Sequence, residues 1–300
     1  MTHYRHIFIL LLLLLLPLSA SAQTKHALVI GLGAQKDPSW NKINGDNDVP
    51  HVVSMLKAGG YKDIRTLVNS KATKKGIVDA FRTLTASCRR GDIVYIHYSG
   101  HGQQVTDVSG DEPDGKDESW IPYDAYRRPC SHDRGEKHLI DDEVYVLLSN
   151  IRAKVGDTGK ILVVVDACHS GGSTREAEEE SDDDSSSDEE ERETLRGVAD
   201  VFDMIVGTIK GLYYGNSHGP ERWITISACK DNETNAEMKT PKVGKLTYAL
   251  STIVSEKRPG SNSAFDTELR RFFNRYRGRN VQSPTITGEK SKYSIISILH

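Results

Sequence analysis

The chain alternates short apolar runs with amphipathic stretches, and this alternation strongly constrains its fold. Mainly apolar runs recur six times, at residues 26–32, 64–68, 92–98, 160–165, 223–228 and 293–299. Two amphipathic stretches, 48–58 and 73–88, separate the first three runs, and the second of them places apolar residues on one helix face. Strands that alternate with helices require crossover connections, and runs that are apolar throughout are typical of covered parallel strands. The sequence therefore predicts an α/β fold with a mixed, mostly parallel six-stranded sheet and helices on both faces.

The second half of the chain continues the pattern around an unusual acidic segment. Further helices are predicted at 142–151, 198–212, 246–254 and 264–276. Residues 176–193 hold twelve acidic side chains and one Arg, a local charge of −11, whereas the whole chain carries −3. This segment has no apolar residue large enough to offset the entropy of ordering it, so we interpret it as a solvated loop inserted into one domain spanning 23–300. The simplest interpretation of this acidic segment is an inert surface insertion.

The N-terminus has the pattern of an export signal. Apolar residues 7–16 follow Arg5 and precede the small-residue sequence Ala20-Ser21-Ala22. This run is shorter than the roughly 20 residues that a spanning helix needs, and the order of its parts is that of a secretory signal peptide, 1–22, removed before Gln23. We expect a periplasmic or secreted protein with no stable membrane span once the signal is removed. An uncleaved N-terminal anchor is the alternative.

Reactive side chains follow the two most apolar strands. Ser99-Gly100-His101-Gly102 comes directly after one of them, and residues 166–172, which contain Cys168, come after the other. Ligands of open α/β sheets bind at the carboxyl ends of parallel strands, so these segments should converge. A Cys beside a His makes a nucleophile with a general base, and flanking glycines let backbone N–H groups approach an oxyanion. His169 is a competing base, although a side chain adjacent to the nucleophile in sequence points elsewhere.

Simpler interpretations exist for these residues. A Cys after a strand is often a small buried hydrophobe, and a His in a Gly-rich turn is often a satisfied surface group. No compact basic cluster with interleaved aromatic residues is present, so we expect no nucleic-acid partner.

The two reactive blocks carry a resemblance to a known family. Residues 98–102 (Tyr-Ser-Gly-His-Gly) and 166–171 (Asp-Ala-Cys-His-Ser-Gly) resemble the catalytic blocks of caspase-like cysteine peptidases, specifically metacaspases and their bacterial relatives. Residues 227–232 and 282–284 are also similar to late family segments. The resemblance implies that Cys168 is the nucleophile and that His101 is the general base and then acid. It also implies an oxyanion hole made by the N–H groups of Gly102 and Cys168, a thioester acyl-enzyme, peptide or protein substrates, and no cofactor for the chemistry.

The same resemblance implies an acidic specificity pocket formed by Asp48, Ser99 and Asp166. Partly desolvated carboxylates attract a guanidinium or ammonium group and repel an acidic one, so cleavage after Arg or Lys is expected. The alternative is that Asp166 only caps a turn and Asp48 only caps a helix. Gly45 stands where metacaspases often have Cys.

Two regulatory features are also expected. Calcium-activated metacaspases have acidic residues at positions like Asp117, Asp141 and Asp142, and carboxylate oxygens suit Ca²⁺, although acidic loops are also often simply solvated. Candidate self-cleavage sites lie at the ends of the acidic segment, at Arg175, Arg192 and Arg196.

Two other functions fit the same residues. A catalytically silent caspase-like binding module would keep the fold without turnover. A redox thiol protein would pair Cys168 with Cys130 or Cys229 in a disulfide.

Overall fold

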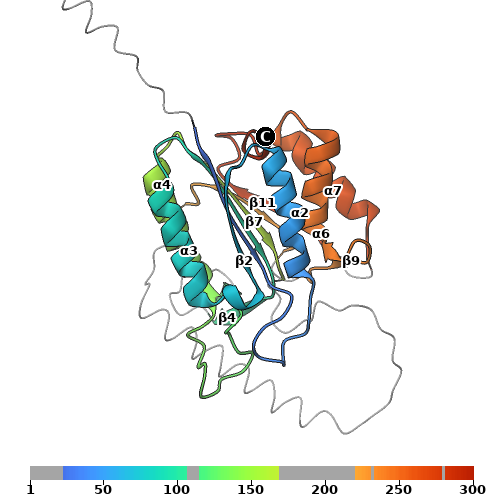
Figure 1. Cartoon of the computed structure of the whole chain (residues 1–300). Coiled ribbons are helices and arrows are strands. Elements are labelled where there is room, and N and C mark those ends of the chain that lie inside the picture. Colours follow the sequence, from blue (N-terminus) through green and yellow to red (C-terminus); the bar gives the residue numbers. More distant parts are fainter. Residues whose placement is uncertain (1–22, 107–114, 169–219, 231–232, 279–280) are drawn as a thin grey trace, which may run out of the picture.

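The structure is a computed structural model that describes residues 23–106, 115–168, 220–230, 233–278 and 281–300 (Figure 1). The predicted signal peptide, the acidic insertion and the helix predicted at 198–212 lie outside the described residues.

A six-stranded sheet forms the centre of the molecule, in the order β11-β8-β7-β3-β1-β2. Five strands are parallel and β11 runs antiparallel to β8. This confirms the predicted mixed, mostly parallel sheet. The strands are β1 (Lys25–Gly31), β2 (Asp63–Val68), β3 (Ile93–Ser99), β7 (Lys160–Asp166), β8 (Ile224–Ser227) and β11 (Thr285–Gly288).

The sixth strand is not where the sequence predicted it. The apolar run 293–299 was expected to be a strand, but it contains helix α8 (Ile296–Leu299), and β11 supplies the sixth strand instead. Both Ile298 and Leu299 are fully buried, and the Tyr61 hydroxyl donates to the Ile298 carbonyl at 2.9 Å. Periodicity alone does not distinguish a short buried helix from a buried strand, which explains the error.

Helices cover both faces of the sheet, as predicted. Figure 1 shows α3 and α4 on one face and α2, α6 and α7 on the other. The helices are α2 (Gly45–Ala58), α3 (Lys74–Ser87), α4 (Asp141–Val155), α6 (Lys245–Thr252), which continues into the π-helical turn η2 (Ile253–Lys257), and α7 (Asn262–Arg275), with a short 3₁₀ turn, η1 (Asn69–Lys71).

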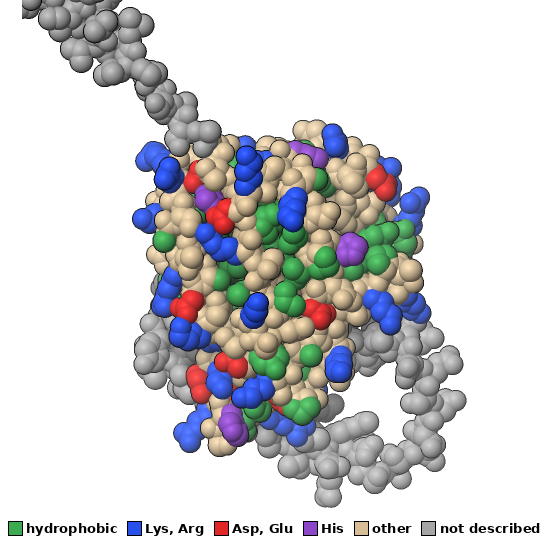
Figure 2. All heavy atoms as spheres, viewed as in Figure 1, with side chains coloured by type: hydrophobic (Ala, Val, Ile, Leu, Met, Phe, Trp, Pro, Cys, Tyr) green, Lys and Arg blue, Asp and Glu red, His purple; other side chains and the backbone are tan. Residues whose placement is uncertain are grey.

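Side chains of each central strand divide between two apolar cores. In β1, Ala27 and Val29 belong to the core under α2, α6 and α7, whereas Leu28 and Ile30 belong to the core under α3 and α4. Successive side chains of a strand point to opposite faces, so a strand that is buried on both faces must be apolar at every position. Figure 2 shows that Lys and Arg side chains are spread over the face drawn, with apolar side chains between them.

Two small sheets that the sequence did not predict complete the described fold. One consists of β4 (Gly102–Thr106), β5 (Lys116–Trp120) and β6 (Leu139–Ile140), and the other of β9 (Glu237–Met238) and β10 (Val243–Gly244). The first begins directly after His101, and the second leads directly into α6. Among the described residues, no helix combines the length and apolar character needed to cross a membrane.

Candidate active site

The register of two neighbouring strands places Cys168 and His101 at the same edge of the sheet. Strands β3 and β7 are parallel neighbours in which Ser99 lies opposite Asp166. His101 and Cys168 each follow that pair by two residues, and the Gly100 N–H donates to the Asp166 carbonyl at 3.4 Å. The two reactive blocks therefore leave the sheet together, as expected for the carboxyl ends of parallel strands.

The sulfur atom of Cys168 is buried against a loop between β8 and β9. The Cys168 side chain is 6% exposed, and its Sγ accepts the main-chain N–H of Asn235 at 3.0 Å. The second buried thiol nearby, Cys229, directs its Sγ at the Ala167 carbonyl at 3.4 Å. All four cysteines lie in described ranges, and no disulfide joins Cys168 to Cys130 or Cys229.

His101 is held by a backbone carbonyl and an aromatic ring. Its Nε2 lies 2.7 Å from the carbonyl oxygen of Asn41, and its ring centroid is 5.1 Å from that of Trp40. Because a carbonyl oxygen only accepts, Nε2 carries the proton and Nδ1 keeps the lone pair in the neutral ring. The imidazole is therefore set in the tautomer in which Nδ1 is the basic nitrogen. Nothing in the sequence pattern had singled out Asn41 or Trp40.

The glycines around His101 have different surroundings. A Cβ on Gly100 would lie 2.6 Å from the Tyr98 hydroxyl oxygen, so a larger residue would disturb the hydrogen bond of 2.6 Å from that hydroxyl to the His101 carbonyl. Gly102, predicted for the oxyanion hole, begins β4 and is half-buried.

Asp48, Ser99 and Asp166 lie together in one buried cluster. We call its two carboxylates, Asp48 and Asp166, the acidic pair. All three are fully buried. The Ser99 hydroxyl donates to Asp48 Oδ2. A Cβ on Gly45 would come within 2.6 Å of the Ser99 carbonyl oxygen, so this backbone leaves no room for the Cys that metacaspases often have there.

The first turn of α6 covers the acidic pair. The Gly244 N–H donates to Asp48 Oδ1 at 2.6 Å, and the Thr247 N–H donates to Asp166 Oδ2 at 2.9 Å. The Thr247 hydroxyl lies 3.2 Å from Asp48 Oδ2 and 2.9 Å from Asp166 Oδ2, so a single hydroxyl reaches both carboxylates. N–H groups at a helix N-terminus suit negative charge, which explains why two buried carboxylates are stable here. Sequence reasoning missed both residues, because a Gly three positions before a Thr is a weak signal on its own.

A buried imidazole continues the hydrogen-bond network away from the acidic pair. His97 Nε2 lies 3.2 Å from Thr247 Oγ1, and His97 Nδ1 lies 3.1 Å from the Tyr95 hydroxyl. Burial lowers the pKa of His97 to about 4, although the negative charge of Asp166 acts in the opposite direction. His97 is therefore neutral at neutral pH.

Asn235 connects the acidic pair to the nucleophile. Its side-chain amide nitrogen donates to Asp166 Oδ1 at 2.7 Å, and its side-chain oxygen accepts from Gln282 Nε2 at 2.5 Å. The Asn235 residue is 1% exposed. Its role was not predicted, because it lies 67 positions after Cys168 in the sequence.

The three carboxylates predicted to bind calcium also lie near one another. Asp117 and Asp142 are buried, and burial together with the charges of Asp117 and Glu118 raises the pKa of Asp141 well above its usual range. Within the described ranges, however, no group of three His, Cys, Asp or Glu side chains is arranged to hold a metal ion. His169 and the predicted processing sites Arg175, Arg192 and Arg196 lie outside the described residues.

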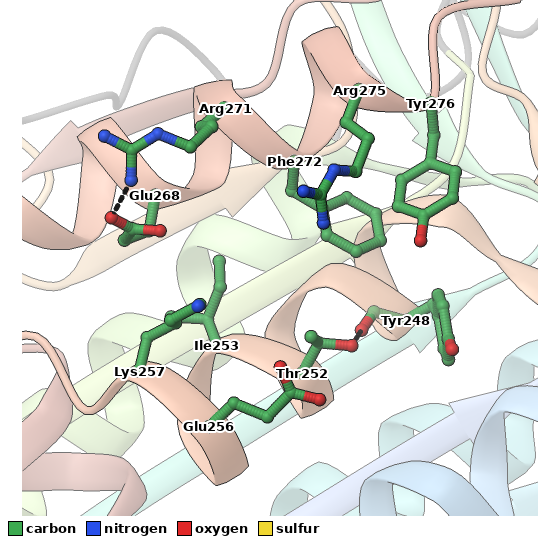
Figure 3. A pocket seen from close by; sticks show the side chains of 10 residues that line it. All are labelled: Tyr248, Thr252, Ile253, Glu256, Lys257, Glu268, Arg271, Phe272, Arg275 and Tyr276. Atoms are coloured by element: carbon green, nitrogen blue, oxygen red, sulfur yellow. Dashed lines mark hydrogen bonds and ion pairs between the residues drawn. The ribbon is translucent and has the colours of Figure 1, made fainter.

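A separate groove lies between α6 with η2 and α7. It has a volume of about 280 Å³. Figure 3 shows Arg271 paired with Glu268 on one side, and the rings of Phe272 and Tyr276 near Arg275 on the other. None of its lining residues belongs to the acidic pair or to the Cys168 and His101 site.

The comparison with known families decides the assignment. The caspase domain family matches residues 24–293 of this chain. The chain belongs to the caspase domain family. The resemblance found in its two reactive blocks is therefore confirmed over nearly the whole chain.

Curated relatives of this caspase-domain chain include fungal metacaspases. It is 28% identical over 269 residues to Metacaspase-1 of Schizosaccharomyces pombe, covering 77% of this chain and 60% of the relative. It is 27% identical over 268 residues to Metacaspase-1 of Mycosarcoma maydis, covering 76% of this chain and 60% of the relative. The chain thus spans about 60% of the length of these two relatives.

Solved structures share the fold. A crystal structure of a protein from Geobacter sulfurreducens matches with a TM-score of 0.63 and 23% identity, covering 90% of this chain and 97% of that one. Caspase-1 from Spodoptera frugiperda matches with a TM-score of 0.54 and 10% identity, covering 89% of this chain and 86% of that one. At these identities the likeness concerns the fold alone.

Proposed function

We propose that this protein is a cysteine endopeptidase in which Cys168 is the nucleophile and His101 is the general base. The observation that carries the proposal is the common position of the two residues, each two residues beyond the paired Ser99 and Asp166. The hydrogen bond from His101 Nε2 to the Asn41 carbonyl supports it, because it leaves Nδ1 able to take a proton.

The proposed reaction needs no cofactor. The thiol proton passes to His101 Nδ1 while Cys168 Sγ attacks the scissile carbonyl carbon, and the carbonyl electron pair moves to oxygen. The N–H groups of Gly102 and Cys168 stabilise that oxyanion. The C–N bond then breaks, His101 protonates the leaving amine, and a thioester remains. A water molecule, deprotonated by His101, hydrolyses the thioester and regenerates the thiol.

The proposed substrates are peptides or proteins with Arg or Lys before the scissile bond. The acidic pair Asp48 and Asp166 supports this preference, because two carboxylates linked through one Thr247 hydroxyl concentrate negative charge in a buried space. Both carboxylates are fully buried. Binding of a basic side chain therefore requires the segments that cover the pair to move aside.

The test is a peptidase assay with fluorogenic peptides that end in Arg, Lys or Asp. Wild type should cleave the Arg and Lys peptides, and Cys168→Ala should cleave none. His101→Ala should lose about 10² to 10⁴ in rate without unfolding, since a positioned acid and base contributes about that much. Cleavage after Asp alone would overturn the specificity. Silence on all peptides, together with no labelling of Cys168 by a thiol-directed peptidyl inhibitor, would favour the catalytically silent binding module.

We also propose that calcium activates the peptidase without taking part in the chemistry. Mutual repulsion in the cluster of Asp117, Asp141 and Asp142 supports it, because a divalent cation would relieve that repulsion. The same assay with calcium or with a chelator tests it, and Asp142→Asn should abolish any calcium response while keeping the activity measured in chelator. Equal cleavage rates with calcium and with the chelator would contradict calcium activation.

Self-cleavage at Arg175, Arg192 or Arg196 is proposed because these residues match the expected specificity and lie at the ends of the acidic segment. Replacing all three with Gln should prevent processing and lower activity, and unchanged processing would contradict the idea. Export is proposed from the pattern of residues 1–22. The N-terminal sequence of the protein recovered from expressing cells should then begin at Gln23.

A further inference from the structure

Asn235 contacts both the nucleophile and the acidic pair, although it lies 67 positions after Cys168 in the sequence. Its main-chain N–H donates to the sulfur of Cys168 at 3.0 Å, and its main-chain carbonyl lies 3.8 Å from the same sulfur as an acceptor for the thiol. The N–H is the nearer of the two groups. A donor that points at sulfur stabilises the thiolate relative to the thiol, and so lowers the pH at which the nucleophile forms.

The side chain of Asn235 determines where that N–H points. Asn235 lies in the loop between β8 and β9, outside both strands. Its side-chain nitrogen donates to Asp166 Oδ1 at 2.7 Å, and its side-chain oxygen accepts from Gln282 at 2.5 Å. With the residue 1% exposed, these side-chain bonds are not readily replaced by water.

The same amide also orients Asp166. One oxygen of this carboxylate accepts from Asn235, and the other accepts from the N–H and hydroxyl of Thr247. Removing the amide would remove the bond that holds Oδ1 of Asp166 from the loop between β8 and β9. The carboxylate could then rotate, and one half of the acidic pair would lose its fixed orientation.

We propose that Asn235 is a positioning residue for both Cys168 and Asp166, its main-chain N–H favouring the thiolate and its side chain orienting the specificity carboxylate. The part that concerns Asp166 rests on the proposed preference for Arg and Lys. The part that concerns the thiol does not depend on any peptidase activity.

The experiment measures alkylation of Cys168 by iodoacetamide as a function of pH, read at the Cys168 peptide by mass spectrometry. In Asn235→Ala the midpoint of this profile should rise by about 0.5 to 1 pH unit, because the main-chain N–H is kept but is no longer held against the thiolate by the side chain, which weakens one hydrogen bond. Asn235→Asp keeps the size of the side chain but places a carboxylate beside Asp166, and it should raise the midpoint as well. The control is Asn262→Ala, because Asn262 also ties loops together, donating to the Tyr293 carbonyl at 2.9 Å, but it does so away from Cys168.

A second readout follows the acidic pair. With an Arg peptide, Asn235→Ala should raise KM about tenfold and weaken inhibition by benzamidine, a guanidinium mimic, whereas Asn262→Ala should change neither. Gln282→Ala, which removes only the outer bond, should shift both readouts less and in the same direction, and it serves if Asn235→Ala does not fold. An unchanged alkylation midpoint in folded Asn235 and Gln282 variants would overturn the inference. If the midpoint shifts but the protein cleaves no peptide, the role of Asn235 at the thiol is supported and the proposed peptidase function is contradicted.

Discussion

At the scale of single residues, three buried side chains, Tyr95, His97 and Thr247, form a hydrogen-bonded chain that ends at the acidic pair. Each hydrogen bond in this chain has one defined donor and one defined acceptor. The Tyr95 hydroxyl donates to His97 Nδ1, His97 Nε2–H donates to Thr247 Oγ1, and the Thr247 hydroxyl donates to a carboxylate of the acidic pair. Neutral His97 supplies one donor and one acceptor, which matches this direction. The chain therefore sets the orientation of Thr247, and Thr247 in turn sets that of Asp166.

Replacing Thr247 tests this chain. Thr247→Val keeps the shape but loses the hydroxyl, so KM for Arg peptides should rise about tenfold, since a hydrogen bond to a charged group contributes about 1.5 to 3 kcal/mol. Thr247→Ser keeps the hydroxyl and should stay within about threefold of wild type. Steady-state kinetics of the three proteins check the prediction, and equal KM values for the Val and Ser variants would contradict it.

The lowered pKa of His97 predicts a pH dependence of stability. Burial lowers the folded-state pKa of His97 to about 4, whereas an unfolded His titrates near 6.5. Between these two values the unfolded chain binds the proton more tightly, so the free energy of unfolding should fall as the pH decreases from about 6.5 to about 4. The loss between pH 7 and pH 5 should be about 2 kcal/mol. Urea unfolding of wild type and His97→Gln checks this, because the variant should lack that part of the slope.

At the scale of elements, the start of α6 both builds and covers the acidic pair. The two N–H donors that reach Asp48 and Asp166 belong to residues 244 and 247, at the beginning of the helix. The close approach of backbone to carboxylate depends on a residue without a side chain at position 244. A Cβ on Gly244 would lie 2.1 Å from Asp166 Oδ2 and 2.6 Å from Asp48 Oδ2.

Gly244→Ala should therefore push the start of α6 away from the sheet. We expect a loss of about 2 kcal/mol or more in the free energy of unfolding, by overpacking, and a large loss of kcat/KM for Arg peptides. The control is Gly260→Ala, because a Cβ at Gly260 meets nothing within 4 Å. Thermal unfolding and steady-state kinetics check both variants. Equal stability and equal kcat/KM in the two variants would contradict a tight packing of the α6 start against the carboxylates.

At the scale of the whole molecule, Arg152 joins segments that are distant in the sequence. This residue of α4 is 3% exposed and donates to the carbonyl of Gly159 at 2.9 Å, to that of Arg222, and to the Tyr293 hydroxyl at 3.3 Å. These bonds connect α4 to the segments that lead into β7 and β8 and to the C-terminal region. They lie at the amino ends of the strands, opposite the candidate active site.

Arg152→Met should lower the free energy of unfolding by about 3 kcal/mol, because carbonyl groups that accepted from a buried guanidinium would lose their donors. The kcat/KM of the folded protein should stay within about threefold of wild type, since the site lies at the other edge of the sheet. Urea unfolding and kinetics test the two parts separately. Lost activity in a stably folded variant would contradict this separation.

The amino-acid sequence by itself was enough to identify the strand and helix alternation, the reactive blocks around His101 and Cys168, and the family that they resemble. Local patterns carry this information, because strands buried on both faces must be apolar and parallel strands end at one edge. The last strand was misplaced because the short run 293–299 satisfies burial as a helix as well as it would as a strand.

Only the tertiary structure decided which residues complete the site. Asn41, Asn235, Gly244 and Thr247 come from loops and a helix start that fold against the edge of the sheet, and each is an ordinary polar or small residue in its own stretch of sequence. Their roles arise from single hydrogen bonds between segments up to about two hundred residues apart. Periodicity and local motifs register burial and turns, but they carry no signal for one donor that meets one distant acceptor, and that pairing exists only once the chain has folded.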